Sequence, residues 1–355
     1  MQRLEFEMFA NEILSRLPTK CIGRLRCVSR QWRYELSSQL FAIIHYHRTA
    51  KYEAPKVITL TNSSIDLLNL INGKVDISSK KTISFPVDSC LSNLTILASE
   101  YGLLLISVHW LPNELILWNP TTNKFKNLCD KKPKHFFDFA TDAVGMYIDS
   151  SNDVKILLLQ RRMDHIVPRL YSRKTCEWKT LTFMKDPDLG SLCLYWLSSG
   201  AFCNKVLYFP SAHYWLPAKS YTIAFDVESE TFSKFPIPQS TNLKGRQRSF
   251  LKLRNTLHMF ILLETPETIV KLYKFEDDLW SEVLSFSNVK VFFSYEAWRN
   301  NLYENKGDTW SVDIDRCGII DIQIGMKESE YLGDVVTYKG LHNVASFEET
   351  VVSPI

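Results

Sequence analysis

The chain has 355 residues, 45% of them hydrophobic and 23% charged, an ordinary balance for a globular protein that buries a core without disulfide or metal support. Its formal net charge is +3, which is too small to indicate binding of nucleic acid or an anionic membrane by the whole surface. The eight cysteines are scattered and form no Cys-x-x-Cys pair, so we expect reduced thiols, no metal site and no cofactor.

The first 45 residues have a helical period. Phe6, Phe9, Ile13 and Leu17 step by three or four, which places them along one side of a helix. The proline after Leu17 is expected to end this helix, because the residue before a proline is pushed out of the α region. The same spacing continues at Ile22, Leu25, Val28, Trp32, Leu36 and Leu40. The pattern predicts three short helices.

From about residue 55 the pattern changes to short apolar runs separated by Gly, Pro, Asn, Asp and Ser. Residues 56–60, 102–106, 154–159 and 221–225 are examples, and each predicts a strand between turns. No long helical period intervenes, so the pattern favours an antiparallel, all-β domain over one with helices between parallel strands.

An internal repeat indicates how these strands are organised. Four segments open with an aromatic residue, cross a polar turn and reach a second aromatic residue seven positions later: 118–125, 171–178, 225–232 and 273–280. Segments that recur about every 50 residues are typical of kelch-like propeller blades, which bury their faces against one another. A β-sandwich with similar hairpins is the alternative.

Two parts of the sequence resemble a known family. Glu-Ile-Leu-Ser-Arg-Leu-Pro-Thr-Lys at 12–20 and Arg-Leu-Arg-Cys-Val-Ser-Arg-Gln-Trp-Arg at 24–33 resemble the F-box of plant F-box proteins, in both motifs and in their spacing. Trp-Asn-Pro-Thr-Thr at 118–122 is similar to the most recognisable element of the F-box-associated, kelch-like interaction domain that follows such F-boxes. Residues 145–155, 204–209 and 347–354 resemble further elements of that domain.

The resemblance implies a chain that is α+β by segment. A small three-helix F-box would occupy residues 1–47, and an all-β, kelch-like β-propeller for target recognition would occupy residues 48–355. It implies a non-catalytic, substrate-recognition subunit of a Skp–cullin–F-box ubiquitin ligase. Such a subunit docks on a Skp-family adaptor, and through it on a cullin scaffold, and presents a bound target protein for ubiquitination. We expect it in the nucleus, the cytoplasm or both.

The residues of the helical segment fit a docking module. About forty-five residues provide too little interior for all its apolar side chains, so some of them must face a partner or the propeller. The alternative is that they form only the core of the segment itself. The residues that we expect to bind the adaptor are Phe9, Ile13, Leu14, Leu17, Pro18, Ile22, Leu25, Val28 and Trp32.

Two departures from the family motif suggest a weaker adaptor contact. Glu5 and Phe6 stand where the family has Leu-Pro, and Gly23 stands where it usually has Leu. Glycine inside a helix costs about 1 kcal/mol relative to alanine. These departures leave open a second function, that of an interaction or scaffold protein with a weakened F-box.

The basic residues of the helical segment offer a third hypothesis. Residues 16–33 contain six Lys or Arg side chains and no acidic one, and short helices with clustered arginines also describe a helix-turn-helix DNA-binding protein. That hypothesis requires Arg16, Arg24 and Arg26 to contact phosphates. We favour no nucleic-acid partner, because no second DNA-binding element is visible.

Neither a catalytic site nor a target-binding site is marked by a motif. The sequence has no phosphate-binding loop or nucleophile elbow, and no membrane span is expected. The pair His45 and His47 is expected to lie in a linker rather than on a metal. Propellers bind partners through loops at one end of their blades, for which 161–169, 211–219, 238–248 and 298–310 are candidates. Aromatic residues in or beside them that fit either target binding or blade packing are Tyr214, Trp215, Trp298 and Trp310.

Overall fold

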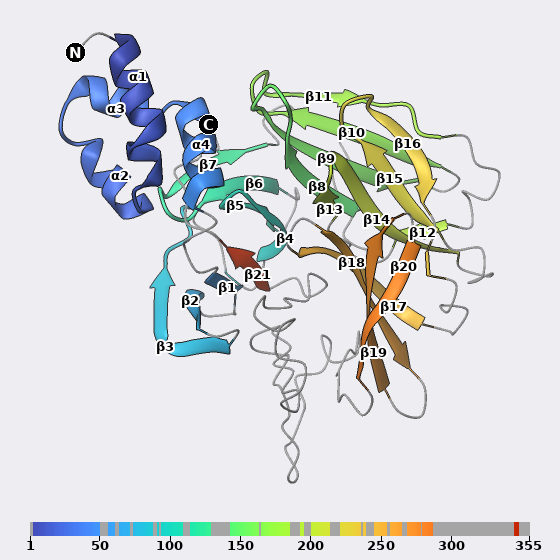
Figure 1. Ribbon diagram of the computed structural model, residues 1–355. Coiled ribbons are helices and arrows are strands. Elements are labelled where there is room, and N and C mark those ends of the chain that lie inside the picture. Colours follow the sequence, from blue (N-terminus) through green and yellow to red (C-terminus); the bar gives the residue numbers. More distant parts are fainter. Residues whose placement is uncertain are drawn as a thin grey trace.

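The computed structural model describes most of the chain, in separate stretches. These are residues 3–49, 56–60, 64–71, 74–87, 91, 94–108, 114–128, 143–162, 165–184, 192–194, 200–213, 221–235, 237–238, 245–253, 256–264, 268–277, 279–286 and 344–347. A group of helices comes first in the chain and lies beside a larger, all-β region (Figure 1).

The N-terminal segment contains four α-helices and one turn of 3-10 helix. They are α1 (Arg3–Glu12), η1 (Leu14–Arg16), α2 (Thr19–Leu25), α3 (Arg30–Leu36) and α4 (Gln39–Thr49). The expected number of three helices is therefore wrong. The spacing from Trp32 to Leu40 does not belong to one helix, because Ser38 begins a new one and its Oγ accepts the backbone N–H of Phe41 at 3.2 Å.

Pro18 acts as expected on the residue before it, which is extended. Leu17 has φ −78° and ψ 149°. However, α1 ends earlier, at Glu12, and the chain continues in a tighter turn in which the N–H of Leu17 donates to the carbonyl of Leu14 at 3.1 Å. None of the helices in the described residues is long and apolar enough to cross a membrane.

The described strands form five separate antiparallel sheets, which are the blades of a β-propeller (Figure 1). Blade 1 contains β1 (Lys56–Leu60), β2 (Ile65–Ile71), β3 (Lys74–Ile83) and β21 (Val344–Phe347); blade 2 contains β4 (Leu94–Glu100), β5 (Leu103–Val108), β6 (Glu114–Asn119) and β7 (Lys124–Asn127); blade 3 contains β8 (Ala143–Ile148), β9 (Val154–Arg161), β10 (Ile166–Ser172) and β11 (Glu177–Thr180). Blade 4 contains β12 (Leu192–Leu194), β13 (Ala201–Cys203), β14 (Val206–His213), β15 (Thr222–Asp226) and β16 (Thr231–Phe235); blade 5 contains β17 (Gly245–Leu253), β18 (Thr256–Glu264), β19 (Thr268–Glu276) and β20 (Leu279–Phe286). The expected all-β propeller is confirmed, and the alternative of two facing sheets is excluded.

The end of the chain closes the first blade. Strand β21 pairs with β1 in antiparallel register, from Thr59 opposite Val344 to Lys56 opposite Phe347. It occupies the edge of blade 1 that β4 occupies in blade 2. Because its hydrogen bonds join two ends of the chain that are far apart in sequence, this strand fastens the ring of blades.

The repeated aromatic residues face each other across the last two strands of three blades. The opposed pairs are Trp118 and Phe125, Tyr171 and Trp178, and Phe225 and Phe232. The turn between them is held by the side chain that follows the first aromatic residue. Asn119 Oδ1 accepts two backbone N–H groups of its turn at 2.8 and 3.1 Å, and Asp226 Oδ1 does the same at 2.7 and 3.0 Å. The polar residue after the aromatic is thus a turn signal.

The fourth copy of the repeat differs from the prediction. Trp280 stands opposite Phe275, not opposite Tyr273. The turn of this hairpin is two residues shorter, since Glu276 pairs directly with Leu279, and a register shift between Leu272 and Tyr273 restores the alignment of the strands. The seven-residue spacing at 273–280 is therefore not a spacing between cross-strand partners.

We expect prolines in β21 to destabilise the whole propeller. In an antiparallel pair of strands, every second residue donates its backbone N–H to the partner strand. One of the two neighbours Ala345 and Ser346 must therefore do so, and the double substitution Ala345→Pro/Ser346→Pro removes that hydrogen bond. The free energy of unfolding, measured in urea, should fall by roughly 1–3 kcal/mol, the cost of a buried polar group without a partner.

The control for this change is Leu279→Ala, because Leu279 is 72% exposed on the surface of blade 5. It should alter stability by no more than about 0.5 kcal/mol. If the proline variant were as stable as this control, β21 would not close the ring.

Candidate functional site

The helical segment leaves large apolar side chains in solvent. In the described part of the chain seven large hydrophobic residues are exposed, and five of them lie in this segment: Met8, Ile13, Val28, Tyr34 and Leu40. The propeller contributes only Phe125 and Leu279 to this group. A concentration of exposed apolar side chains on so small a part of a protein marks an interaction surface.

The nine predicted adaptor-binding residues divide into two groups. Ile13, Pro18 and Val28 are exposed and available to a partner. The other six are buried or half-buried and form the core beneath that surface: Phe9, Leu14, Leu17, Ile22, Leu25 and Trp32. Their contact with an adaptor stays a prediction. The nine do not include exposed Met8, Tyr34 and Leu40. Leu40 belongs to the apolar spacing, whereas Tyr34 lies off the stripe of Trp32 and Leu36, which was the available signal of its exposure.

The Cys-Val-Ser-Arg-Gln-Trp motif builds the start of α3. Ser29 is extended, and its Oγ accepts the backbone N–H of Trp32 at 3.1 Å, which is an N-cap. Trp32 then packs edge-on against Phe9 of α1, with ring centroids 6.4 Å apart. The serine and the tryptophan together fix the connection between α2 and α3, and Val28 lies exposed at that connection, 64% accessible.

Helix α4 holds the Glu-Ile-Leu-Ser-Arg-Leu-Pro segment from behind. His45 is fully buried, and its Nε2 lies 2.8 Å from the carbonyl oxygen of Leu17. Arg48 Nη2 donates to Glu12 Oε1 at 3.0 Å and Arg48 Nη1 donates to Ser15 Oγ at 3.1 Å. The hydrogen bond from Arg48 lowers the pKa of Glu12. These contacts correct the expectation that His45 and His47 lie in a linker, since both belong to α4.

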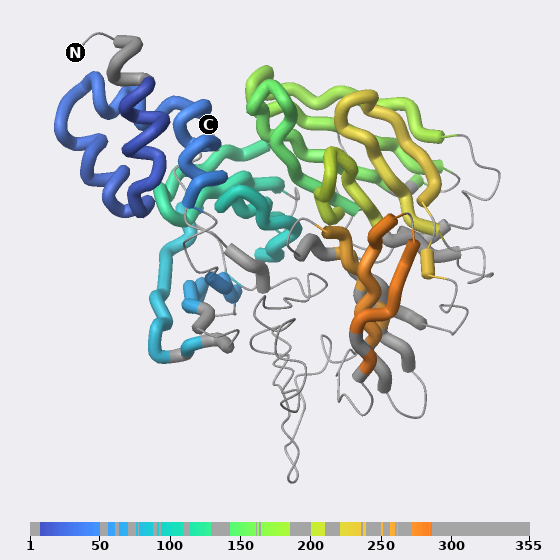
Figure 2. Tube along the Cα trace, in the orientation of Figure 1, coloured from blue at the N-terminus to red at the C-terminus, as the bar shows by residue number. Residues whose placement is uncertain are grey.

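The other side of α4 lies on the propeller, as Figure 2 shows. Tyr46 packs on Tyr101 of the β4–β5 turn with ring centroids 5.0 Å apart. Arg173, in the β10–β11 turn, donates to Gln39 Oε1 at 2.7 Å. A single cluster of buried apolar residues continues from the helices into blades 2 and 3. The helical segment is therefore fixed to the propeller by packing and not joined by a free linker.

These contacts distinguish two faces of the propeller. We call the face that carries the turns at 101–102 and 173–176 the near face, because α4 lies on it. The described residues with positive φ all lie in short near-face turns, which left-handed residues make possible: Tyr101, Gly102, Asn123, Asn152, Cys176, Asn204, Lys205, Glu230 and Asp277. In an antiparallel blade alternate connections lie at opposite ends, so the remaining connections leave from the far face.

Three of the predicted target-binding loops are flanked by strand ends at the far face, those of β9 and β10, of β14 and β15, and of β16 and β17. The fourth loop, 298–310, lies outside the described residues. The four aromatic candidates, Tyr214, Trp215, Trp298 and Trp310, lie outside the described residues. Their role in target binding stays a prediction.

The three arginines that the DNA-binding hypothesis needs differ in their surroundings. Arg26 points inward, and its Nε donates to the carbonyl of Leu36 at 3.0 Å. Burial lowers the pKa of its guanidinium. Arg16 lies beside Glu12, with 3.8 Å between Nη2 and Oε2. Two of the three arginines that the hypothesis needs are thus engaged within the chain.

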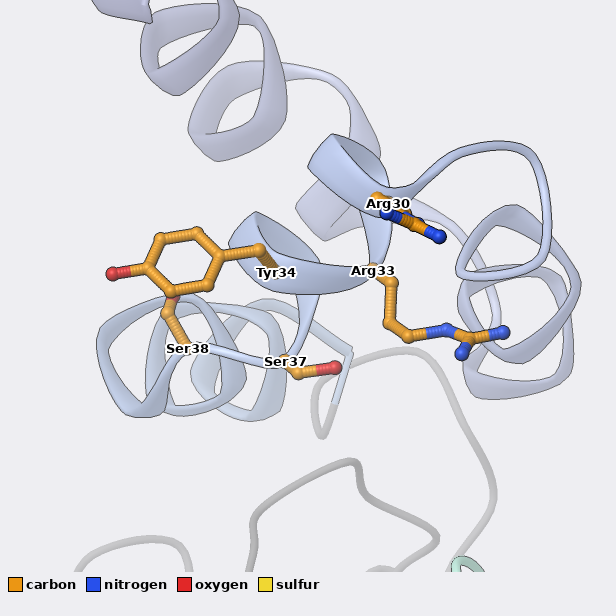
Figure 3. A pocket seen from close by; sticks show the side chains of 5 residues that line it. All are labelled: Arg30, Arg33, Tyr34, Ser37 and Ser38. Carbon is orange, nitrogen blue, oxygen red and sulfur yellow. The ribbon is translucent and has the colours of Figure 1, made fainter.

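A surface pocket of about 530 Å³ lies at the end of α3 (Figure 3). Arg30, Arg33, Tyr34, Ser37 and Ser38 line it.

In the described part of the chain, no group of three His, Cys, Asp or Glu side chains is placed to hold a metal ion.

Two families of protein domains match this chain. The F-box associated beta propeller domain matches residues 56–299, and the F-box domain matches residues 10–43. The chain belongs to the F-box proteins with an F-box associated propeller. The first match covers all five blades except β21, and the second covers the helices from the end of α1 into α4.

F-box proteins of Arabidopsis thaliana are similar to this chain along most of its length. An F-box/kelch-repeat protein is 26% identical over 312 residues, which are 81% of this chain and 81% of that protein. Another F-box protein is 22% identical over 293 residues, 78% of this chain and 77% of that protein.

In the present chain α4 runs to Thr49, across the domain boundary that we predicted between residues 47 and 48.

Gly23 is a position at which we expect a substitution to stabilise the F-box. It lies inside α2, is exposed, and an added Cβ would meet no atom within 4 Å. Gly23→Ala should therefore raise the free energy of unfolding by about 0.5–1 kcal/mol, because alanine loses less backbone entropy in a helix. Urea unfolding of the two proteins side by side measures this, and a loss of stability would contradict the open environment of the site.

The buried histidines should make stability depend on pH below neutrality. Burial lowers the pKa of His45, and the nearby Arg26 charge lowers it further; burial also lowers the pKa of His258 in β18. The folded state thus binds fewer protons than the unfolded state, so stability is complete above about pH 6.5 and falls as the pH drops below it. Each histidine should contribute up to about 1.4 kcal/mol per pH unit.

The variant His45→Gln isolates the contribution of His45 to the pH dependence of stability, because the glutamine amide can still donate to the carbonyl of Leu17 but does not titrate. The free energy of unfolding between pH 5 and pH 8 should fall less steeply in the variant than in the parent protein. Equal slopes would show that His45 is not held neutral in the folded state.

Proposed function

We propose that this F-box protein is a substrate-recognition subunit of a Skp–cullin–F-box ubiquitin ligase, acting in the nucleus, the cytoplasm or both. The F-box would bind a Skp-family adaptor and through it a cullin scaffold, and the propeller would bind a target protein. The observation that supports this best is the gathering of exposed apolar side chains on a helical segment that is itself packed onto the propeller.

The energetics of the exposed surface suit a stable complex. Full burial of an aliphatic side chain such as Ile13 or Val28 contributes about 1.5–3 kcal/mol, and a micromolar complex requires about 8 kcal/mol in total. Five exposed apolar side chains are enough to supply most of that amount, and a few central ones commonly dominate such an interface. The core beneath them keeps the surface in one shape.

The chain itself would carry out no chemistry. Its contribution would be to hold a lysine of the target close to a charged ubiquitin-conjugating enzyme, which raises the effective concentration of the reacting groups. The attachment of α4 to blades 2 and 3 serves this purpose, because a rigid receptor keeps the target at a fixed distance from the adaptor. The target would bind at the far face, where the kelch-like repeat places its connections.

A scaffold protein with a weakened F-box is the second candidate. Gly23 presents no side chain at a position that faces open space, and α1 begins at Arg3 without the proline that often starts a helix. If this candidate is right, the adaptor affinity is low and Gly23→Leu raises it.

Binding to a purified plant Skp-family adaptor tests the proposal. Isothermal titration should give a dissociation constant of about 1 μM or lower for the parent protein. The double variant Ile13→Asp/Val28→Asp should weaken binding by about 100-fold or more, since it introduces two charges into an apolar contact. Both positions are more than half exposed, so the fold should persist.

Leu279→Asp is the control, because it places one such charge on an exposed apolar residue of the propeller. It should bind the adaptor as the parent protein does. A parent protein that is folded and does not bind at micromolar concentration would refute the ligase assignment.

A further inference from the structure

The pocket at the end of α3 is lined by two arginines and by hydroxyl groups. Arg30, Arg33, Tyr34 and Ser37 stand at helical spacing and lie on one side of α3, and Ser38 begins the next helix. In Figure 3 the two guanidinium groups extend toward the same side, while Tyr34 and Ser38 lie on the other, with Ser37 between them. Both arginines, Tyr34 and Ser37 are exposed.

The two arginines have no acidic partner within the described residues. Arg30 makes no ion pair there, and Arg33 makes one long contact, from its Nε to the carbonyl of Arg26 at 3.4 Å. This separates them from Arg16 and Arg48, which lie beside Glu12, and from Arg26, which is bonded to Leu36. The pocket therefore presents two unneutralised guanidinium groups and hydroxyl donors, the groups that bind carboxylates in protein interfaces.

Exposed apolar side chains lie in the same part of the chain as the charges. Tyr34 is 69% exposed, and Leu40, two residues after Ser38, is 54% exposed. Arginine beside aromatic and aliphatic side chains is typical of the centre of a protein–protein interface, whereas a phosphate backbone makes little use of apolar neighbours. A volume of about 530 Å³ has room for two or more side chains.

We propose that this pocket binds an acidic segment of the Skp-family adaptor, with aspartate or glutamate side chains on Arg30 and Arg33. The inference rests on the proposed function and adds a second, electrostatic contact to the apolar one at Ile13 and Val28. Charge complementarity of this kind fixes the orientation of the adaptor and speeds its association.

The test compares adaptor binding by two double variants that remove the same charge. Arg30→Gln/Arg33→Gln changes the pocket, and Lys81→Gln/Lys124→Gln changes two exposed lysines on blades 1 and 2. We expect the pocket variant to lose about tenfold or more in affinity at low salt, and the lysine variant to change by less than about threefold. Raising the salt concentration from about 0.05 M to about 0.5 M should lower the adaptor affinity of the parent protein more than that of the pocket variant.

The outcomes separate the two proposals. If the parent protein binds, Ile13→Asp/Val28→Asp does not, and the pocket variant binds as well as the lysine variant, the ligase function stands and the acidic-segment inference is wrong. If the parent protein does not bind the adaptor, both fail. A pocket variant that keeps its adaptor affinity and loses affinity for a DNA duplex would overturn the inference in favour of a nucleic-acid site.

Discussion

Helix α4 is bonded on two sides, and the arrangement of the whole molecule depends on it. On one side His45 and Arg48 hold the turn that runs from Glu12 to Leu17. On the other side Tyr46 packs on Tyr101, and Gln39 accepts a hydrogen bond from Arg173. Without this helix the F-box would be a small group of helices on a flexible tether. With it, the exposed apolar surface has a defined position relative to all five blades.

The same attachment makes the two faces of the propeller different. The near face has short turns with left-handed residues such as Asn123, Cys176 and Glu230, and α4 covers part of it. At the far face lie the opposite ends of the same strands, such as those of β9 and β10. A receptor that binds its adaptor on one side and its target on the other needs such a division, because the two partners must not compete for space.

Local signals in the sequence were enough to predict much of this structure. The Leu17-Pro18 turn and three of the four aromatic hairpins each depend on residues within about eight positions of one another, so a pattern can reveal them. The fourth hairpin was misaligned because its turn at Asp277 is two residues shorter, so the partner of Trp280 is Phe275, while the equally aromatic Tyr273 happens to stand seven residues before Trp280. Spacing alone does not distinguish two aromatic residues that face each other across a hairpin from two that do not.

Long-range packing could not be predicted in this way. The role of α4 depends on contacts from His45 to Leu17 and from Gln39 to Arg173, which are 28 and 134 residues apart in sequence. Likewise, the family resemblance and the apolar character of the segment identified nine residues for the adaptor surface but could not separate exposed Ile13 and Val28 from buried Leu14 and Ile22. That separation depends on which side of each helix the neighbouring helices cover.

Hydrogen exchange of the F-box protein with and without a Skp-family adaptor tests the central claim most directly. The claim is that the adaptor contacts the exposed side of α1, α2 and α3, while α4 stays on the propeller. The account predicts slower exchange within residues 8–36 and unchanged exchange in the near-face turns at 101–102 and 173–176. Protection of the propeller turns instead, or no protection within residues 8–36, would contradict it.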